Sequence, residues 1–337
     1  MAGWQFRVGV LGCGQVSPDH FIAWQRCTGA IVVAACDPGP GRAQVRATQF
    51  NVPATYLSPD EMFRNEKLDL VDIVTPRETH AAMVRLARDH GVHAICEKPL
   101  CPTLAQAETL VDEIGDTIRL MVNENWRYRP YYTLIGRWIR EGRLGKVVHY
   151  RMALKRSNML RNTEGIVPAL VRQPFMAKEE RLLVAESLIH ELDVTRSLLG
   201  DLTVIASRLG RASHAVIGDD IATVFMENAD GVTAIVEGVL SAAGYPIRTG
   251  DRLEICGTRS SLLLNDDGIL RLFGAENEEH RFDEIEVRQK CFDLSIRHFV
   301  DQVRSGGPFW TSARDQLGTL KLVEDAYNLA GPIRQFV

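Results

Sequence analysis

The strongest constraint on the fold is the first 125 residues, where short apolar runs alternate with segments of helical length and pattern. Each run is continuously apolar, which is typical of strands that are buried on both faces of a parallel sheet. Parallel strands joined by helices indicate a doubly wound α/β sheet. The expected strands are residues 6–11, 31–36, 70–74, 93–96 and 119–122, and the expected helices are 17–26, 41–50, 77–90 and 104–114.

The pattern changes after Pro130, where longer strand-like runs are separated by glycine-containing turns. This indicates an antiparallel or mixed sheet in a second, α+β domain. We predict domains over residues 1–126 and 127–337, with the last helix a candidate to pack back on the first domain. The expected strands are residues 147–155, 203–211, 221–227, 232–240, 252–256 and 261–264, and the expected helices are 132–141, 182–199, 291–304 and 313–329. Residues 158–181 are polar and irregular, and are predicted to form a covering loop.

Composition limits the classes of function. The 337 residues suffice for two domains of about 150 residues each. The net charge of −4 gives no general attraction to nucleic acid or to an anionic membrane. No apolar run reaches the roughly 18 residues of a membrane span, and no charged leader precedes the first strand, so we expect neither a membrane protein nor a signal peptide. The seven cysteines are odd in number and form no C-x-x-C, which favours reduced thiols of a cytoplasmic protein over zinc ligands.

Residues 9–17 connect the first expected strand to its helix and carry two glycines in the spacing of a phosphate-binding turn. In the pattern G-x-G-x-x-G, the first glycine makes the tight turn, and the second lets a pyrophosphate approach the backbone. Gly12 and Gly14 fit these two positions, and Gln15 and Val16 lead into the helix. The helix N-terminus would offer free N–H groups to a phosphate. The segment therefore predicts dinucleotide binding, and the alternative is a strand–turn–helix corner without a ligand.

The residues around this turn indicate which dinucleotide is expected. Ser17 stands at the third motif position, where we expect it to cap the helix, with Pro18 at the first helical position. Asp37 ends the second strand, where a carboxylate binds the adenosine ribose hydroxyls and repels a 2′-phosphate. We therefore predict NAD, while Arg42, five residues further on, leaves NADP possible.

Polar residues follow several expected strands at their carboxyl ends, where the ligands of open parallel sheets bind. These candidates are Thr75, Pro76, His80, Glu97, Lys98 and residues 123–127. We expect them to converge with the glycine turn on one crevice. Read alone, the sequence Glu97-Lys98-Pro99 fits either a solvated loop with an incidental ion pair or a reactive lysine at a strand end.

A second polar constellation lies in the helix expected over residues 182–199. Glu186, His190 and Asp193 are spaced i, i+4 and i+7, so they share one helix face. The spacing fits a solvated polar face, a metal site or a catalytic group. For hydride transfer from an alcohol, His190 could take the hydroxyl proton, Glu186 could orient its ring, and Lys98 could stabilise the alkoxide charge.

Five features occur in one order along the chain: Gly12-Cys13-Gly14, Asp37, Thr75-Pro76 with His80, Glu97-Lys98-Pro99, and Ile189-His-Glu-Leu-Asp193. With them the chain resembles the glucose–fructose oxidoreductase / inositol dehydrogenase family of NAD(P)-dependent dehydrogenases over nearly its whole length. The resemblance implies a Rossmann domain followed by an open-faced mixed sheet that usually forms an oligomer interface, hence a homodimer or homotetramer. It also implies that Lys98 and His190 are catalytic, that Glu97 and Thr75-Pro76 touch the cofactor, and that the bond before Pro99 is often cis.

The resemblance also suggests substrate-binding residues. Residues 125–130 resemble the family's R-[FY]-x-P turn, which often reaches the nicotinamide and the substrate. This makes Asn125 a candidate for cofactor binding, and Trp126 and Arg127 candidates for substrate binding together with Asp193. One departure is Glu186, because family members usually carry aspartate four residues before the histidine. The extra methylene shifts the carboxylate by about 1 Å and retains its charge.

The substrate is less constrained. The sequence Arg172-Gln173-Pro174 resembles family members that act on branched or small sugars, such as apiose dehydrogenases, which makes Arg172 a further candidate. Residues 151–181 hold seven basic and three acidic residues, which fits a solvated loop or recognition of an acidic sugar. A carboxylate-free sugar is the default expectation.

We therefore predict an NAD-dependent oxidoreductase that acts on a sugar, polyol or sugar acid. The alternatives are a non-catalytic dinucleotide-binding regulator and a redox-neutral, NAD-dependent glycosidase.

Overall fold

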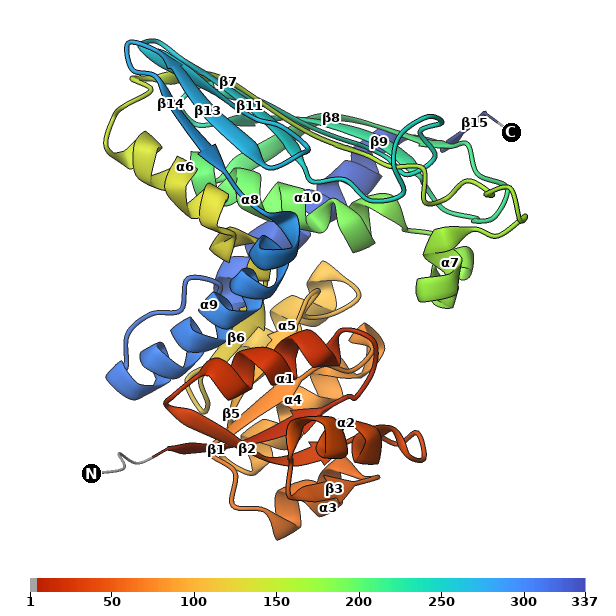
Figure 1. The fold of residues 1–337 in the computed structure, drawn as a ribbon, viewed down its shortest axis with the longest axis vertical. Coiled ribbons are helices and arrows are strands. Elements are labelled where there is room, and N and C mark those ends of the chain that lie inside the picture. The colour runs from red at the N-terminus through yellow and green to blue at the C-terminus, as the bar shows by residue number, and fades with distance from the viewer. Residues whose placement is uncertain (1–4, 337) are drawn as a thin grey trace. The chain divides into compact units, whose positions relative to one another are not determined.

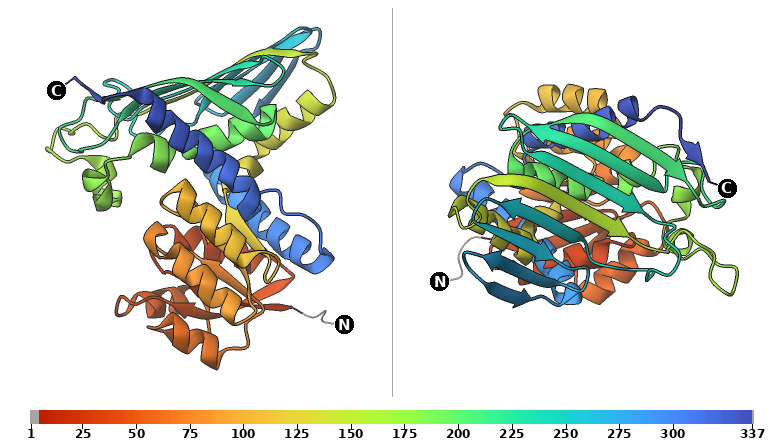
Figure 2. Two further views of the ribbon diagram at one scale, coloured as in Figure 1. Left: turned by 180° about the vertical axis from the view of Figure 1, so that it is seen from behind. Right: turned by 90° about the horizontal axis from the view of Figure 1, so that it is seen from above.

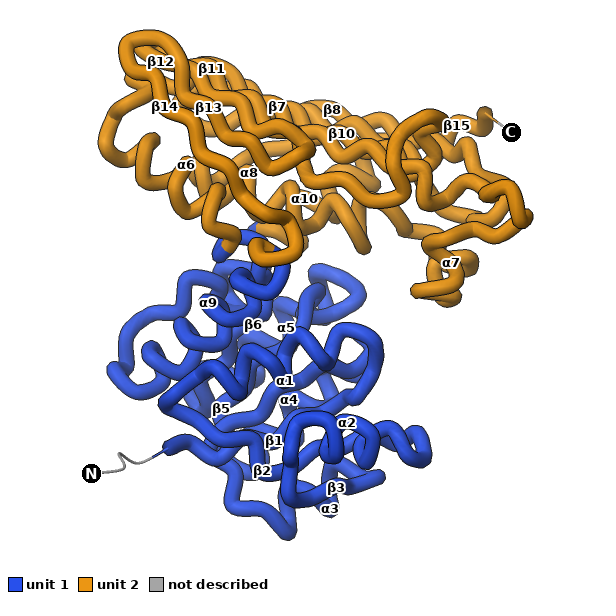
Figure 3. Tube along the Cα trace, viewed as in Figure 1, with its two compact units in different colours: residues 1–128, 288–318 blue, residues 129–287, 319–337 orange. Residues whose placement is uncertain are grey.

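The computed structural model describes residues 5–336 and divides them between two units (Figures 1 and 3). Of the described residues, unit 1 holds 5–128 and 288–318, and unit 2 holds 129–287 and 319–336. The first division falls two residues after the predicted one, and residues 288–318 join the first unit although the sequence analysis assigned them to the second. The expectation of no leader rests partly on residues 1–4, which lie outside the described residues.

Unit 1 contains the predicted Rossmann sheet. Its six strands are all parallel, in the order β3-β2-β1-β4-β5-β6, so the chain order reverses beside β1. The strands are β1 Phe6–Leu11, β2 Ala30–Cys36, β3 Ala54–Tyr56, β4 Leu70–Ile73, β5 His93–Glu97 and β6 Leu120–Asn123. The helices are α1 Ser17–Arg26, α2 Arg42–Phe50, α3 Pro59–Asn65, α4 His80–Asp89 and α5 Leu104–Ile114, with short 3₁₀ turns at Arg77–Thr79 and Asn125–Tyr128. The α/β fold class is confirmed, and β3 and α3 are additions that the sequence analysis missed.

Helix α9, Glu284–Ser305, covers part of this unit from residue 288 onward. Its residues Phe292, Ile296 and Phe299 join one buried cluster with Phe21 and Trp24 of α1. The helix begins seven residues before the predicted start because the Asp283 carboxylate accepts hydrogen bonds from the first free N–H groups, those of residues 285 and 286.

Unit 2 is built on a nine-stranded mixed sheet in the order β14-β13-β12-β11-β7-β10-β9-β8-β15. Strands β7 and β10 pair in parallel at its centre, β15 pairs in parallel with β8, and the other pairs are antiparallel. The strands are β7 Val147–Lys155, β8 Leu202–Arg211, β9 Ile221–Asn228, β10 Thr233–Val239, β11 Arg252–Gly257, β12 Ser260–Leu264, β13 Ile269–Gly274, β14 Glu278–Arg281 and β15 Arg334–Gln335. The last three were not predicted.

Helices cover one face of this sheet, and the other face carries no helix among the described residues (Figure 2). The covering helices are α6 Pro130–Arg140, α8 Ile189–Leu199 and α10 Ala313–Ala330. Two predictions need correction here. The covering loop contains a short helix, α7 Pro168–Arg172, and a 3₁₀ turn, Pro174–Lys178. The helix expected over 182–199 begins as a π turn, Leu183–Ser187, and becomes α-helical only at Ile189.

None of the helices in residues 5–336 combines the length and apolar character needed to cross a membrane.

The α9 contact predicts a stability difference along one helix. Phe299 is fully buried in the cluster, and Ile285 on the same helix is 81% exposed. Phe299→Ala should therefore lower the free energy of unfolding by about 3–5 kcal/mol, because it removes buried apolar area and leaves a cavity. Ile285→Ala should change it by less than about 0.5 kcal/mol. Urea unfolding followed by circular dichroism measures both, and equal effects would contradict the packing of α9.

Candidate active site

The glycine turn after β1 is shaped by close backbone contact on one side and open space on the other. Gly12 has φ +97°, its N–H donates to the Cys36 carbonyl at 2.8 Å, and a Cβ there would lie 2.3 Å from the Val74 carbonyl oxygen. No side chain fits at this position. A Cβ on Gly14 would meet no atom within 4 Å. The backbone at Gly14 is therefore open to the approach of a ligand.

Ser17 does not cap α1, contrary to prediction. The N-cap is Val16, and the Ser17 hydroxyl instead donates to the Gly14 carbonyl at 2.8 Å. Arg46 from α2, which the sequence analysis missed, donates to both the Ser17 hydroxyl (3.0 Å) and the Gly14 carbonyl (3.2 Å). A serine inside the first turn can donate its hydroxyl to a preceding carbonyl group instead of accepting from the helix N–H groups. Ser17 and Arg46 thereby fix the Gly14 carbonyl, and Gln15 is exposed.

Asp37 is buried at the end of β2 and binds the turn directly. Its carboxylate accepts hydrogen bonds from the backbone N–H groups of Cys13 (2.8 Å) and Gly39 (2.7 Å). Arg42, with a side chain 66% exposed, lies 3.9 Å away. Burial, and then the Asp37 charge, raise the pKa of the Cys13 thiol to about 12, so this thiol stays protonated. The carboxylate is fixed where its remaining lone pairs suit ribose hydroxyls, which fits an NAD-type dinucleotide.

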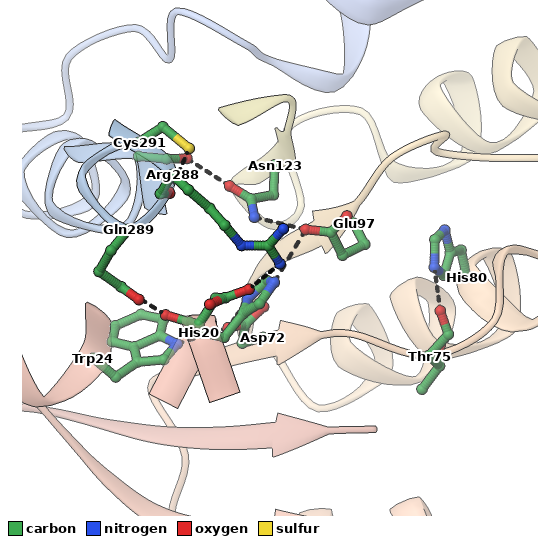
Figure 4. Close-up of polar contacts among 12 residues, drawn as sticks. His20, Trp24, Asp72, Thr75, His80, Glu97, Asn123, Arg288, Gln289 and Cys291 are labelled. Atoms are coloured by element: carbon green, nitrogen blue, oxygen red, sulfur yellow. Dashed lines mark hydrogen bonds and ion pairs between the residues drawn. The ribbon is translucent and has the colours of Figure 1, made fainter. Parts of the chain in front are cut away.

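His80 joins two loops at the carboxyl ends of the strands. Its buried ring lies between two backbone carbonyl oxygens: Nε2 is 2.9 Å from that of Thr75 (Figure 4), and Nδ1 is 2.8 Å from that of Pro99. The ring thereby links the loop after β4, which holds Pro76, to the turn after β5. The Lys98-Pro99 peptide bond is cis. Both ring nitrogens of His80 lie within hydrogen-bond distance of backbone carbonyl groups, and its contact with the cofactor stays a prediction.

Glu97 is held by two donors on one oxygen. Its Oε1 lies 3.1 Å from His20 Nε2 and accepts a hydrogen bond from Asn123 Nδ2 at 2.7 Å (Figure 4). Burial alone would raise the pKa of Glu97, but the bond and charge of His20, the amide of Asn123 and the charge of Lys98 outweigh it and lower the pKa. Glu97 is therefore an ionised carboxylate.

His20 and Asp72, which lie behind Glu97, were not predicted as site residues. Asp72 is a fully buried acid within the apolar strand β4, and its Oδ2 lies 2.8 Å from His20 Nδ1. An acid inside an apolar strand was the one available signal. Its partner could not be read from the sequence, because the pair spans 52 residues.

Residues 125–128 form a 3₁₀ turn directly after β6. Asn125 is buried, and the Trp126 N–H lies 3.4 Å from Glu124 Oε1. Arg127 pairs with Asp315 at 2.7 Å and donates to the Trp310 carbonyl at 2.9 Å. The structure thus gives Arg127 partners within unit 1, and its role in substrate binding stays a prediction.

In unit 2, Glu186 lies in the π turn and His190 in the first turn of α8. π turns occur often at functional sites. Asp219 anchors this segment, because its carboxylate accepts hydrogen bonds from the N–H groups of Leu182 (2.9 Å) and Val184 (3.1 Å). Asp193 accepts a hydrogen bond from Thr319 Oγ1 at 2.6 Å.

Arg172, the remaining candidate, is exposed on α7 of the same unit. The roles assigned to Glu186, His190, Asp193 and Arg172 stay predictions.

Two family models match the chain. Residues 6–123 match the oxidoreductase family with an NAD-binding Rossmann fold, and residues 132–263 match the GFO/IDH/MocA C-terminal domain. The matches cover the sheet of unit 1 and much of the sheet of unit 2, in the predicted order.

Similar proteins include named dehydrogenases. D-apiose dehydrogenase of Paraburkholderia graminis is 32% identical, over 96% of this chain and 87% of that protein. scyllo-Inositol 2-dehydrogenase (NAD⁺) of Bacillus subtilis is 29% identical, over 90% and 87%. Among solved structures, an oxidoreductase of Agrobacterium radiobacter in complex with NAD⁺, L-tartaric acid and magnesium is 27% identical. It superposes with a TM-score of 0.90 over 97% of this chain and 96% of that one.

The two glycines of the turn should behave differently when each gains a methyl group. Gly12→Ala should lower the melting temperature by several degrees and weaken NAD binding, because its Cβ collides with the Val74 carbonyl. Gly14→Ala should leave the melting temperature nearly unchanged and still weaken NAD binding, because its Cβ enters only the open space beside the turn.

Differential scanning fluorimetry and calorimetric titration with NAD⁺ separate the two effects. Wild-type NAD⁺ affinity in Gly14→Ala would show that the cofactor does not use this space.

Proposed function

This chain belongs to the GFO/IDH/MocA family of oxidoreductases with an NAD-binding Rossmann fold, and on this premise we propose that it oxidises a hydroxyl group of a carboxylate-free sugar or polyol, reversibly. The observation that carries the proposal is the strand-end edge of unit 1. There the glycine turn, the Asp37 carboxylate and the Glu97-Lys98-Pro99 turn follow strands of one parallel sheet, the edge at which such sheets bind their ligands.

The proposed binding residues follow from that edge. Gly12, Gly14 and the helix α1 N-terminus hold the pyrophosphate, Asp37 accepts from the adenosine ribose, and Glu97 accepts from the second ribose. NAD, when bound, supplies the hydride acceptor. Thr75, Pro76 and Asn125 complete the cofactor-binding set, and Gln15 and Val16 add backbone at the turn.

The proposed catalytic residues supply charge and proton transfer. The Lys98 ammonium stabilises the negative charge that grows on the substrate oxygen as its proton leaves. The His190 imidazole takes that proton as general base and returns it in the reverse direction. Glu186 orients the ring and stabilises its protonated form, as a carboxylate does in a catalytic triad.

Three of the seven cations of residues 151–181 are paired with acids, and this bears on the substrate class. Arg151 and Lys155 both pair with Glu237 on the adjacent strand, at 2.7 and 3.4 Å, and Arg181 pairs with Glu324 at 3.0 Å. Cations neutralised in this way attract a substrate carboxylate weakly, which favours a neutral sugar. Two similar dehydrogenases are named for D-apiose, a neutral branched sugar, so D-apiose is the first substrate to test.

The proposal includes a cytoplasmic homodimer or homotetramer. The register of the large sheet puts Phe225, Ile235 and Phe273 on the face away from the helices, together with charged residues such as Arg151 and Glu237, and Phe273 is 46% exposed. A helix-free sheet face that exposes large apolar side chains among its ion pairs is a candidate surface for pairing with a second copy. The seven cysteines are all free thiols, as in a reducing compartment.

A substrate panel tests the activity. The purified protein, given NAD⁺ or NADP⁺ with D-apiose, inositols, other neutral sugars, sugar acids and L-tartrate, should form NADH fastest with a neutral sugar or polyol. The Asp37 carboxylate should make NAD⁺ the better cofactor, because it repels a 2′-phosphate. NAD⁺ binding without reduction on any substrate would exclude the dehydrogenase, and a preference for sugar acids would overturn the substrate class.

Lys98→Met should lower kcat by roughly 10²-fold or more, with little change in the Kd for NAD⁺, because it removes one charge-stabilising group and keeps the side-chain length. Lys67→Met is the matched control, since Lys67 is an exposed lysine of the same unit that precedes β4 instead of following a strand. Stopped-flow measurement of a single turnover separates chemistry from product release. Wild-type turnover in Lys98→Met would make Lys98 structural.

A further inference from the structure

The charged groups behind Glu97 form a buried chain that the proposed chemistry does not use. His20 on α1 is fully buried between the carboxylates of Asp72 on β4 and Glu97 on β5. Its Nδ1 lies 2.8 Å from Asp72 Oδ2, and its Nε2 lies 3.1 Å from Glu97 Oε1. One imidazole ring therefore connects an acid in the core of the sheet to the acid that begins the Glu97-Lys98-Pro99 turn.

The geometry fixes the protonation of this ring. An ionised carboxylate only accepts hydrogen bonds, and both ring nitrogens face one, so both bonds form only when each nitrogen carries a proton. A neutral ring would instead direct a lone pair at a carboxylate oxygen. Burial alone would lower the pKa of His20, but the charge and hydrogen bond of Asp72 and those of Glu97 outweigh it and raise the pKa to about 10.

The neighbouring groups reinforce the arrangement. Trp24 Nε1 donates to Asp72 Oδ2 at 2.7 Å, so this oxygen receives two donors. The Phe292 ring of α9 packs against the imidazole, with a centroid separation of 5.0 Å. Of the other charges nearby, Asp19 and Arg288 pair with each other at 2.6 Å, and Lys98 lowers the pKa of Glu97.

Glu97 is thereby left with one oxygen held and one available. Oε1 receives His20 and the Asn123 amide, and the Ser295 hydroxyl fixes that amide by donating to Asn123 Oδ1 at 2.6 Å. Oε2 makes no hydrogen bond to any residue in the range 5–336. A carboxylate held through one oxygen presents the other in a fixed direction.

We propose that His20 is a positioning residue, a buried imidazolium that fixes Glu97 through Oε1 and so leaves Oε2 aimed and ionised to accept a hydrogen bond from a cofactor hydroxyl. The inference rests on the proposed function, because it takes Glu97 as a cofactor contact. Helix α1 would then have a second role, in addition to the proposed binding of phosphate at its N-terminus. The same helix binds phosphate at its first turn and, one turn later, fixes the carboxylate at the end of β5.

The test replaces the cation with a neutral polar group. In His20→Asn, Glu97 loses the bond and charge that oppose its burial, so its pKa should rise and it should take up a proton at higher pH. The Kd for NAD⁺ should weaken on the order of tenfold at pH 7 and weaken further as the pH falls to 5, whereas wild-type Kd stays flat. His93→Asn is the matched control, because His93 is a half-buried histidine at the opposite end of β5 that accepts from the Arg119 N–H.

Calorimetric titration with NAD⁺ from pH 5 to 8 measures these constants without substrate. The proposal is overturned if His20→Asn binds NAD⁺ with wild-type affinity at every pH, or if His93→Asn shows the same pH dependence. If His20→Asn does not fold, the double variant His20→Asn/Asp72→Asn removes the unpaired buried charge as well, and the same titration decides.

Two measurements address the imidazolium in the wild-type protein. Long-range ¹H–¹⁵N spectra of histidine-labelled protein should show both ring nitrogens of His20 protonated at pH 8.5, with the resonance assigned by its loss in a variant. A neutral tautomer at pH 7 would overturn the proposal. The raised pKa also means that the folded state binds a proton that the unfolded chain releases above about pH 6.5. The free energy of unfolding should therefore fall between pH 7 and 10 more steeply in the wild type than in His20→Asn.

These outcomes separate the two proposals. NAD⁺ binding that follows the predicted pH dependence, with no turnover on any substrate, would remove the dehydrogenase and retain the role of His20. Turnover on a sugar by a His20→Asn variant with wild-type NAD⁺ affinity would do the reverse.

Discussion

The edge at which six parallel strands end is the constraint on which the rest of unit 1 depends. Each strand leaves the sheet there with backbone groups that have lost their ladder partners, and buried polar groups need replacements. The site residues are those replacements. Asp37 accepts from the N–H groups of Cys13 and Gly39, and His80 links the carbonyl groups of two separate loops. The groups proposed to bind the cofactor therefore also hold the edge together, which is how a loop region acquires the rigidity that a binding site needs.

The two units bury carboxyl groups by different means. In unit 1, His20 lies between Asp72 and Glu97, and its hydrogen bond and charge help to lower the pKa of Glu97 against the effect of burial. In unit 2, burial and the nearby Asp251 raise the pKa of Glu191 well above its usual range. An ion pair fixes the orientation of its carboxylate and is costly to break. A protonated carboxyl group has no charge with which to attract a ligand. The carboxylate that is proposed to contact the cofactor, Glu97, lies in unit 1, where the buried acids are paired with a histidine.

The sequence predicted what depends on local pattern and missed what depends on pairing across the sheet. Continuous apolar runs located five of the six strands of the first sheet, and glycine spacing located the turn at Gly12. The edge strand β3 has only three half-buried residues, too few to form a run. The partnership of His20 with Asp72 and Glu97 follows from strand order, which places β4 and β5 side by side beneath α1, and no local pattern records that order. The prediction for Ser17 was wrong because a serine hydroxyl can either accept from a helix N–H group or donate to a nearby carbonyl group. The sequence spacing does not distinguish these two bonds, and here the hydroxyl donates to the Gly14 carbonyl.

Glu186 and His190 were predicted to lie in one uninterrupted α-helix, but Glu186 lies in the π turn Leu183–Ser187. Leu188 N donates to the Leu183 carbonyl five residues earlier, at 2.9 Å, so this turn is wider than an α turn. Residues four apart therefore fall short of one full turn here, whereas in an α-helix they exceed it. Asp219, which accepts hydrogen bonds from the N–H groups of Leu182 and Val184, anchors the start of this turn. Glu186 has a longer side chain than the aspartate that is usual in the family. Because it lies in a π turn, both the length of the side chain and the width of the turn determine where its carboxylate lies.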